Sequence, residues 1–328
     1  MGNPIAIGGV PLEPGTSVDG CIEVGNRPDS TPMVVQYQAK VGTSPGPILC
    51  LEAGLSGDAH EGMFAIQRIL ELIDPERLHG TVVAVPVVNM PSFELQHRGS
   101  PFDPAVIRLE QDGDTLSLAE RAARAFDSQI LSQADHLISF CNWSPSLYWQ
   151  RQVAYLDVGK SLPLAMSLGA EWNKLWRLPG APGTSLAAAE ARGIPAVALQ
   201  VADSRGQLPS RREADVGAIV EGIINAMRRL GMWPGSWEPA ERWVVLDEAP
   251  AHNSKWGLLI PGDGVRLGDS VDKGTLLFQV WNLYGEEVES IACPVKGQVA
   301  ALRTFPCVQP GQTVAYISQV VETLDKVS

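Results

Sequence analysis

The chain has 328 residues and a formal net charge of −12, with hydrophobic residues at 45% and charged residues at 19%. This composition is typical of a folded protein with one large domain and a smaller one. The acidic balance and the lack of Lys/Arg clusters argue against a nucleic-acid partner, and no apolar run approaches the ~20 residues of a membrane helix. Five scattered cysteines without a paired spacing, and a start without a basic, apolar leader, favour a cytoplasmic location.

The first two thirds of the chain alternate short apolar strands with amphipathic helices. In chain order we predict strands at 33–39, 48–51, 81–88, 136–140 and 195–201, and helices at 63–73, 116–134, 187–192 and 215–230. The run TVVAVPVV at 81–88 is typical of a parallel strand that is buried on both faces. Ser117 with Glu120 three residues later has the pattern of a capping box at a helix start. Together these elements predict a doubly wound α/β sheet.

Past Trp233 the pattern changes to short β runs separated by turns. We predict strands at 257–260, 276–281, 297–301 and 314–317. The predicted organisation is therefore an α/β domain over 1–235 with an N-terminal β extension, a linker over 236–250, and a C-terminal β module over 251–328.

One stretch, LEAGLSGDAHEGM at 51–63, connects the predicted strand at 48–51 to the helix that follows. A turn between a strand and a helix lies at the carboxyl end of the strand, which is where ligands bind in open α/β sheets. Gly54 and Gly57 permit backbone geometry and close approach that residues with a Cβ resist. We therefore expect a functional site at this turn.

The same stretch resembles the first metal-binding segment of the succinylglutamate desuccinylase/aspartoacylase family, relatives of the zinc carboxypeptidases, which reads roughly A-G-x-H-G-D-E-x-x-G. Other segments are also similar to the family: VPVVNMPSF at 85–93, the arginine and SPFD of 98–103, ADHLI at 134–138 and GIPAVAL at 193–199. The resemblance implies a carboxypeptidase-like doubly wound mixed sheet. It also implies that the C-terminal module is a small β-barrel of the biotinyl/lipoyl, or barrel-sandwich, type.

Four positions of the family pattern carry different residues here. Where the family has zinc-binding His, Glu and His, this chain has Ser56, Ala59 and Cys141, and Gln200 replaces the catalytic Glu. Catalytic zinc needs three imidazole, carboxylate or thiolate ligands, and a carboxamide cannot accept the proton that a general base takes from water. We therefore expect no zinc or other cofactor at this site, and the resemblance leaves enzymatic activity open.

Two arginines match, or nearly match, substrate-binding positions of the family. Arg98 stands where the family arginine polarises the scissile carbonyl, and Ile107-Arg108 stands where an Asn-Arg pair binds the substrate carboxylate. We predict that Arg98 and Arg108 converge as anion anchors on one pocket near Ser56 and Gln200.

Asn89 and Trp143 complete the predicted substrate-binding set. Trp143 follows the strand at 136–140 and is placed to form a wall of a ligand pocket. The leading hypothesis is a metal-free protein that binds a small carboxylate or an N-acyl amino acid-like ligand, and we expect a homo-oligomer.

Two alternatives remain open at the level of sequence. The first is an active amide hydrolase, either with a displaced metal site of His60, Glu61 and Cys141 or with Cys141 as a thiol nucleophile. The second is an oligomeric scaffold whose β module mediates assembly. Metal content separates the first alternative from the leading hypothesis.

Overall fold

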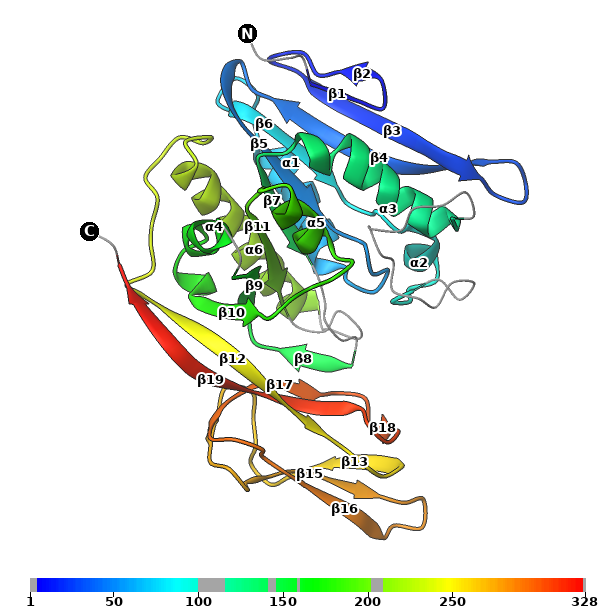
Figure 1. Cartoon of the computed structure of the whole chain (residues 1–328), viewed down its shortest axis with the longest axis vertical. Coiled ribbons are helices and arrows are strands. Elements are labelled where there is room, and N and C mark those ends of the chain that lie inside the picture. Colours follow the sequence, from blue (N-terminus) through cyan, green and yellow to red (C-terminus); the bar gives the residue numbers. More distant parts are fainter. Residues whose placement is uncertain (1–4, 100–115, 141–145, 158–159, 202–208, 327–328) are drawn as a thin grey trace.

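The computed structural model describes residues 5–99, 116–140, 146–157, 160–201 and 209–326. In these residues one large mixed sheet extends from the N-terminal strands into the C-terminal module (Figure 1). Twelve of its strands follow the order β14-β17-β19-β12-β10-β9-β11-β7-β5-β6-β4-β3, and β8 pairs with β17. Its strands are β3 (Ser17–Asn26), β4 (Pro32–Val41), β5 (Ser44–Glu52), β6 (His79–Val85), β7 (His136–Phe140), β8 (Leu147–Trp149), β9 (Gln152–Leu156), β10 (Lys174–Leu178), β11 (Ala196–Gln200), β12 (Arg242–His252), β14 (Ser270–Val271), β17 (Gly297–Arg303) and β19 (Thr313–Asp325).

The middle of the sheet consists of the apolar strands that the sequence predicts. β6, β5, β7 and β11 are parallel neighbours, so their carboxyl ends meet at one edge. β9 pairs antiparallel with β11, and β10 and β12 then continue parallel to β9. The mixed sheet of the predicted fold class is confirmed.

Helices cover both faces of this central part. One face packs against α1 (Glu61–Leu72), α4 (Ser161–Ser167) and α6 (Pro209–Arg229), and the other against α3 (Leu118–Gln129) and α5 (Ser185–Ala191). The short helix α2 (Met90–Glu94) and the 3-10 turns η1 (Leu131–Gln133) and η2 (Ala170–Trp172) lie in connections. Ser117 and Glu120 form the predicted capping box at the start of α3. Among the described residues, no helix is long and apolar enough to cross a membrane.

The C-terminal module encloses a hydrophobic core of its own. A four-stranded sheet of β16 (Glu287–Ala292), β15 (Leu276–Trp281), β13 (Gly257–Pro261) and β18 (Cys307–Val308) contributes to this core together with strands at the end of the large sheet. All four strands predicted in this part of the sequence are present. The closure of these strands into a biotinyl/lipoyl-like barrel stays a prediction. A two-stranded sheet of β1 (Ala6–Ile7) and β2 (Val10–Pro11) lies at the N-terminal end.

The junction between domain and module differs from the predicted linker at 236–250. Residues from Arg242 onward form β12, which pairs with β10 on one side and with β19 on the other. Trp243 and Val245 are buried against the α/β core, so this segment has the hydrophobic side chains of a strand. A second connection comes from β8. The ring of its Trp149 stacks on the ring of Trp176, with ring centres 5.6 Å apart, and its centre lies 4.7 Å from that of the Tyr316 ring. Domain and module therefore share one sheet.

Candidate functional site

The turn between β5 and α1 lies at the carboxyl edge of the parallel strands, as the sequence predicts. Gly54 has a φ of +67°, and a Cβ there would lie 2.7 Å from the Cα of Val87. A Cβ on Gly57 would lie 2.0 Å from the carbonyl oxygen of Ser92. Both positions therefore require glycine, because the turn packs directly against the backbone of the next segment.

Asn89 holds this turn against α2. Its amide nitrogen donates to the carbonyl of Leu55 at 3.2 Å, its amide oxygen accepts from the backbone N–H of Ser92 at 3.2 Å, and its backbone N–H donates to Gly54. Asn89 is fully buried and caps the start of α2. The structure thus gives this predicted ligand-binding residue a role in shaping the turn.

Ser56 and Ala59 lie within one tight turn, where the backbone N–H of Ala59 donates to the carbonyl of Ser56. Ser56 is half-buried and Ala59 is buried, as are the neighbouring carboxyl groups of Asp58 and Glu61. The Nε2 of His60 lies 3.1 Å from the carbonyl oxygen of Gly57. Because a carbonyl can only accept, Nε2 carries the proton in this contact, and Nδ1 of the neutral ring keeps its lone pair.

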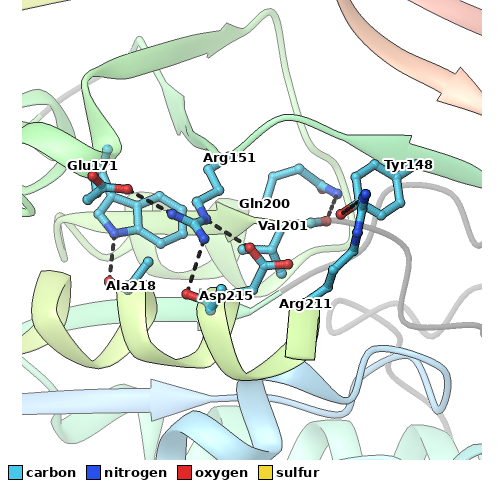
Figure 2. A network of polar contacts seen from close by, with 10 residues as sticks. Tyr148, Arg151, Glu171, Gln200, Val201, Arg211, Asp215 and Ala218 are labelled. Carbon is cyan, nitrogen blue, oxygen red and sulfur yellow. Dashed lines mark hydrogen bonds and ion pairs between the residues drawn. The ribbon is translucent and has the colours of Figure 1, made fainter. Parts of the chain in front are cut away.

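Gln200 ends β11 and is fully buried (Figure 2). Its amide nitrogen donates to the carbonyl of Val201 at 3.0 Å. Its cross-strand partner in β9 is Gln152, which is also buried. Two carboxamides therefore stand side by side at the edge where the family pattern places a catalytic carboxylate.

Arginine contacts border this edge on the α6 side (Figure 2). Arg211, in the first turn of α6, donates to the hydroxyl of Tyr148 at 3.2 Å and lies 5.5 Å from the centre of its ring. Arg151 donates to Asp215 at 2.8 Å, to Glu171 at 2.7 Å and to the carbonyl of Ala214 at 3.1 Å. These contacts fix the entry to β9 against α6.

A buried carboxyl group that sequence reasoning missed lies at the end of β5. Glu52 is fully buried, its neighbour in register on β7 is Ser139, and the hydroxyl of Ser185 donates to it at 2.8 Å. Burial raises the pKa of Glu52 from its ordinary value of 4.5 to about 7, although the hydroxyls of Ser139 and Ser185 oppose that rise. The sequence feature that could have revealed Glu52 is its place at the end of the apolar run ILCLE, but only the fold brings Ser185 to it.

The remaining predicted site residues are only partly described. Arg108, Cys141 and Trp143 lie outside the described residues. Arg98 is described, half-buried, and follows α2. The convergence of Arg98 and Arg108 on one pocket therefore stays a prediction.

Comparison with known proteins supports the resemblance seen in the sequence. No protein-family model matches the chain. The chain is 28% identical over 294 residues to the N-alpha-acetyl-L-2,4-diaminobutyric acid deacetylase of Halomonas elongata, covering 85% of this chain and 84% of that protein. Among solved structures, it resembles the product-bound ectoine utilization protein EutE (DoeB) of Ruegeria pomeroyi, with a TM-score of 0.83, 20% identity and coverage of 97% and 99%. It also resembles the succinylglutamate desuccinylase/aspartoacylase of Rhodobacter sphaeroides, with a TM-score of 0.81, 20% identity and coverage of 93% and 96%.

The expected resemblance to the succinylglutamate desuccinylase/aspartoacylase family is confirmed. The chain has the fold of these proteins over nearly its whole length. The correspondence of Ser56, Ala59 and Gln200 to the zinc ligands and catalytic glutamate of the family pattern stays a prediction.

The described residues at these positions do not fit the zinc ion of the desuccinylase/aspartoacylase family. Ala59 offers only a methyl group and Ser56 a neutral hydroxyl. Among the described residues, which leave out Cys141, no three His, Cys, Asp or Glu side chains are grouped to hold a metal ion. Three ligands of that kind are what a catalytic zinc site requires.

Proposed function

We propose that this chain is a metal-free protein of the desuccinylase/aspartoacylase fold that binds a small carboxylate or an N-acyl amino acid-like ligand. The observation that carries the proposal is the chemistry of two buried positions. A methyl group at Ala59 and a carboxamide at Gln200 stand where the family has carboxylates, although Gly54, Gly57 and Asn89 still hold the turn in place. A retained frame without its reactive groups favours binding over hydrolysis.

The ligand class follows from the relatives and from the polar groups near the site. The Halomonas elongata relative is named for an N-acetylated amino acid, which carries both an amide and a carboxylate. Arg98 supplies a half-buried guanidinium after α2, a group suited to bidentate binding of a carboxylate. Arg108 and Trp143 complete the proposed set, as the resemblance predicts.

Hydrolysis of an amide at this site would need a base and an activated water. Gln200 cannot accept a proton, and its amide nitrogen donates to Val201. General-base catalysis contributes roughly 10²–10⁴-fold. We therefore expect no detectable hydrolysis of N-acyl amino acids by the unmodified chain.

Calorimetric titration of the dialysed protein with N-acetyl amino acids tests this proposal. We expect saturable binding of N-acetylated acids and weaker binding of the same amino acids without the acyl group. Arg98→Met should weaken binding at least tenfold, because the loss of one charged contact lowers the binding free energy by about 1.4 kcal/mol. Arg68→Met, on the exposed face of α1 where Arg68 pairs with Glu213, is the matched control and should bind normally.

The alternative function is an active amide hydrolase that uses His60, Glu61 and Cys141, or the Cys141 thiol alone. It predicts tightly bound metal or loss of activity after thiol alkylation. Release of the free amino acid from an N-acetylated substrate, abolished by Cys141→Ser, would favour this alternative and contradict the metal-free binder.

A further inference from the structure

The four-stranded sheet of the C-terminal module has one face toward the module core and one face away from it. Leu259 of β13 and Val280 of β15 pair in register, and both are buried in that core together with Val308 of β18. Side chains alternate between the two faces along each strand, so the residues next to these three lie on the outer face. In Figure 1 this sheet lies at the end of the module that is far from the α/β domain.

The outer face carries a row of side chains without charge across three strands. Leu258 pairs in register with Trp281 of β15 on one side and with Cys307 of β18 on the other. Residues that stand directly opposite one another in a sheet share a face, so these three side chains lie side by side. Leu258 is 39% exposed, Cys307 is exposed and Trp281 is half-buried.

The apolar surface continues along β18 to Phe305. The backbone N–H of Leu259 donates to the carbonyl of Pro306 at 2.6 Å, so the chain before β18 keeps its register with β13. Phe305 precedes Cys307 by two residues and therefore lies on the same outer face, opposite Ile260. The Phe305 side chain is 41% exposed.

At the other end of β13 the apolar surface reaches the hairpin between β15 and β16. Because Leu258 pairs with Trp281, the start of β13 lies next to the end of β15. Trp256, just before β13, is 63% exposed, and Leu283 and Tyr284 at the hairpin tip are 87% and 92% exposed. We call the large exposed apolar residues of this region the outer patch: Trp256, Leu258, Leu283, Tyr284 and Phe305.

The area of the outer patch suits one half of a dimer interface. With roughly 150–250 Å² for each fully exposed large side chain, the exposed fractions of the patch amount to about 600 Å² of apolar surface. A stable interface buries about 800 Å² per partner, and this area includes a polar rim. Contiguous apolar patches above a few hundred Å² are rare on monomers and mark interaction surfaces.

The outer patch is nearly free of charge, although the whole chain carries −12. The segments WGLLIP at 256–261 and FPCV at 305–308 contain no charged residue, and Lys255, Glu286 and Glu287 stand at the border. A basic partner would be drawn to acidic surface, and an anionic membrane to several Lys or Arg side chains. Two acidic copies meet with least repulsion through an uncharged face, so these features favour a second copy.

We propose that the outer patch is the interface between two copies of this chain, related by a two-fold axis. The same patch on both copies then forms an isologous contact in which one sheet packs face to face on the other. This assigns a surface to the expected homo-oligomer. The proposal does not depend on ligand binding, because the outer patch lies in the module and the turn at Ser56 lies in the α/β domain.

Sedimentation equilibrium of the full chain over a range of concentrations tests the proposal. We expect a reversible equilibrium between monomer and dimer. Leu258→Glu should raise the dissociation constant at least tenfold, because the two-fold axis brings both new carboxylates into one apolar interface. Leu72→Glu makes the same change at an exposed leucine of α1 and should stay within twofold of the unmodified chain.

Alkylation by N-ethylmaleimide, followed by mass spectrometry, locates the interface in the unmodified chain. Cys307 lies beside Leu258 on the outer face, and Cys21, on β3 at the other end of the large sheet, is also exposed. Above the dissociation constant, alkylation of Cys307 should be at least tenfold slower than below it, whereas Cys21 should react equally at both concentrations. In Leu258→Glu, Cys307 should react at the rate of the monomer.

Thermal melts first establish that each variant is folded. If Leu258→Glu does not fold, the protection of Cys307 in the unmodified chain decides the question. A chain that stays monomeric at all concentrations would overturn the proposal. A dimer in which Cys307 reacts as fast as in the monomer, or one that folded Leu258→Glu leaves intact, would place the interface elsewhere and overturn it as well.

Discussion

Replacing Glu52 by glutamine should make the protein more stable at alkaline pH but not at acidic pH. Glu52 is fully buried, and its pKa is raised from 4.5 to about 7. The unfolded chain therefore releases this proton at lower pH than the folded protein does, so the free energy of unfolding falls as pH rises from about 4.5 to 7. Glutamine keeps an oxygen that can accept from Ser185 and carries no charge at any pH.

The size of this effect follows from the two pKa values. A rise in the pKa from 4.5 to about 7 corresponds to about 3 kcal/mol in the free energy of unfolding. The unmodified protein has lost this free energy by pH 8, and the variant has not. Denaturant unfolding at several pH values between 4.5 and 8.5 measures it, as the difference between Glu52→Gln and the unmodified protein. Glu248, whose pKa is also raised to about 7, affects both proteins alike and cancels in that difference.

Glu71→Gln, an exposed carboxylate on α1, serves as the control and should give a small difference without pH dependence. A difference for Glu52→Gln that stays constant across this pH range would refute the reasoning. It would mean that the carboxyl group of Glu52 is ionised at neutral pH, with its charge compensated in place.

Three further predictions concern the turn and the strand end. Gly57→Ala should lower the free energy of unfolding by roughly 3 kcal/mol, or prevent folding, because the added Cβ would clash with the Ser92 carbonyl. Denaturant unfolding measures this loss, and an unchanged free energy of unfolding would contradict the observed packing. Asn89→Ala should cost about 1–2 kcal/mol in the same assay through loss of the α2 cap, and no loss would show that the cap does not contribute. One variant restores the family's three ligands and its catalytic glutamate through Ser56→His, Ala59→Glu, Cys141→His and Gln200→Glu. It should bind about one equivalent of zinc by elemental analysis, whereas Gln200→Glu alone should bind none. Failure of the restored variant, if it is folded, would show that the turn no longer has the geometry of a zinc site.

The elements with strong periodic patterns could be predicted from sequence. α1 and the central strands follow from apolar residues at helical spacing and from β-branched runs, and Ser117 with Glu120 marked the start of α3 correctly. These patterns involve only residues that are close together in the chain, so the sequence alone is enough to predict the elements. The position of the glycine-containing turn at the carboxyl edge of the parallel strands also followed from sequence, because such a turn comes directly after a strand.

Elements that depend on distant partners could not be predicted. The predicted linker at 236–250 includes residues 242–250, which form part of β12 because β10 and β19 lie on either side. β8, β9 and β10 are short and contain polar residues, and their pairing joins segments far apart in the chain. The same limit applies to the site, where Ser185 reaches Glu52 across 133 positions of sequence.

Elemental analysis of the protein as purified, after extensive dialysis, tests the central claim most directly. At the predicted ligand positions Ser56 and Ala59 offer a hydroxyl and a methyl group, which do not replace imidazole and carboxylate ligands. We predict well under one equivalent of zinc per chain. A full equivalent that survives dialysis would contradict a metal-free site and would favour the displaced set of His60, Glu61 and Cys141.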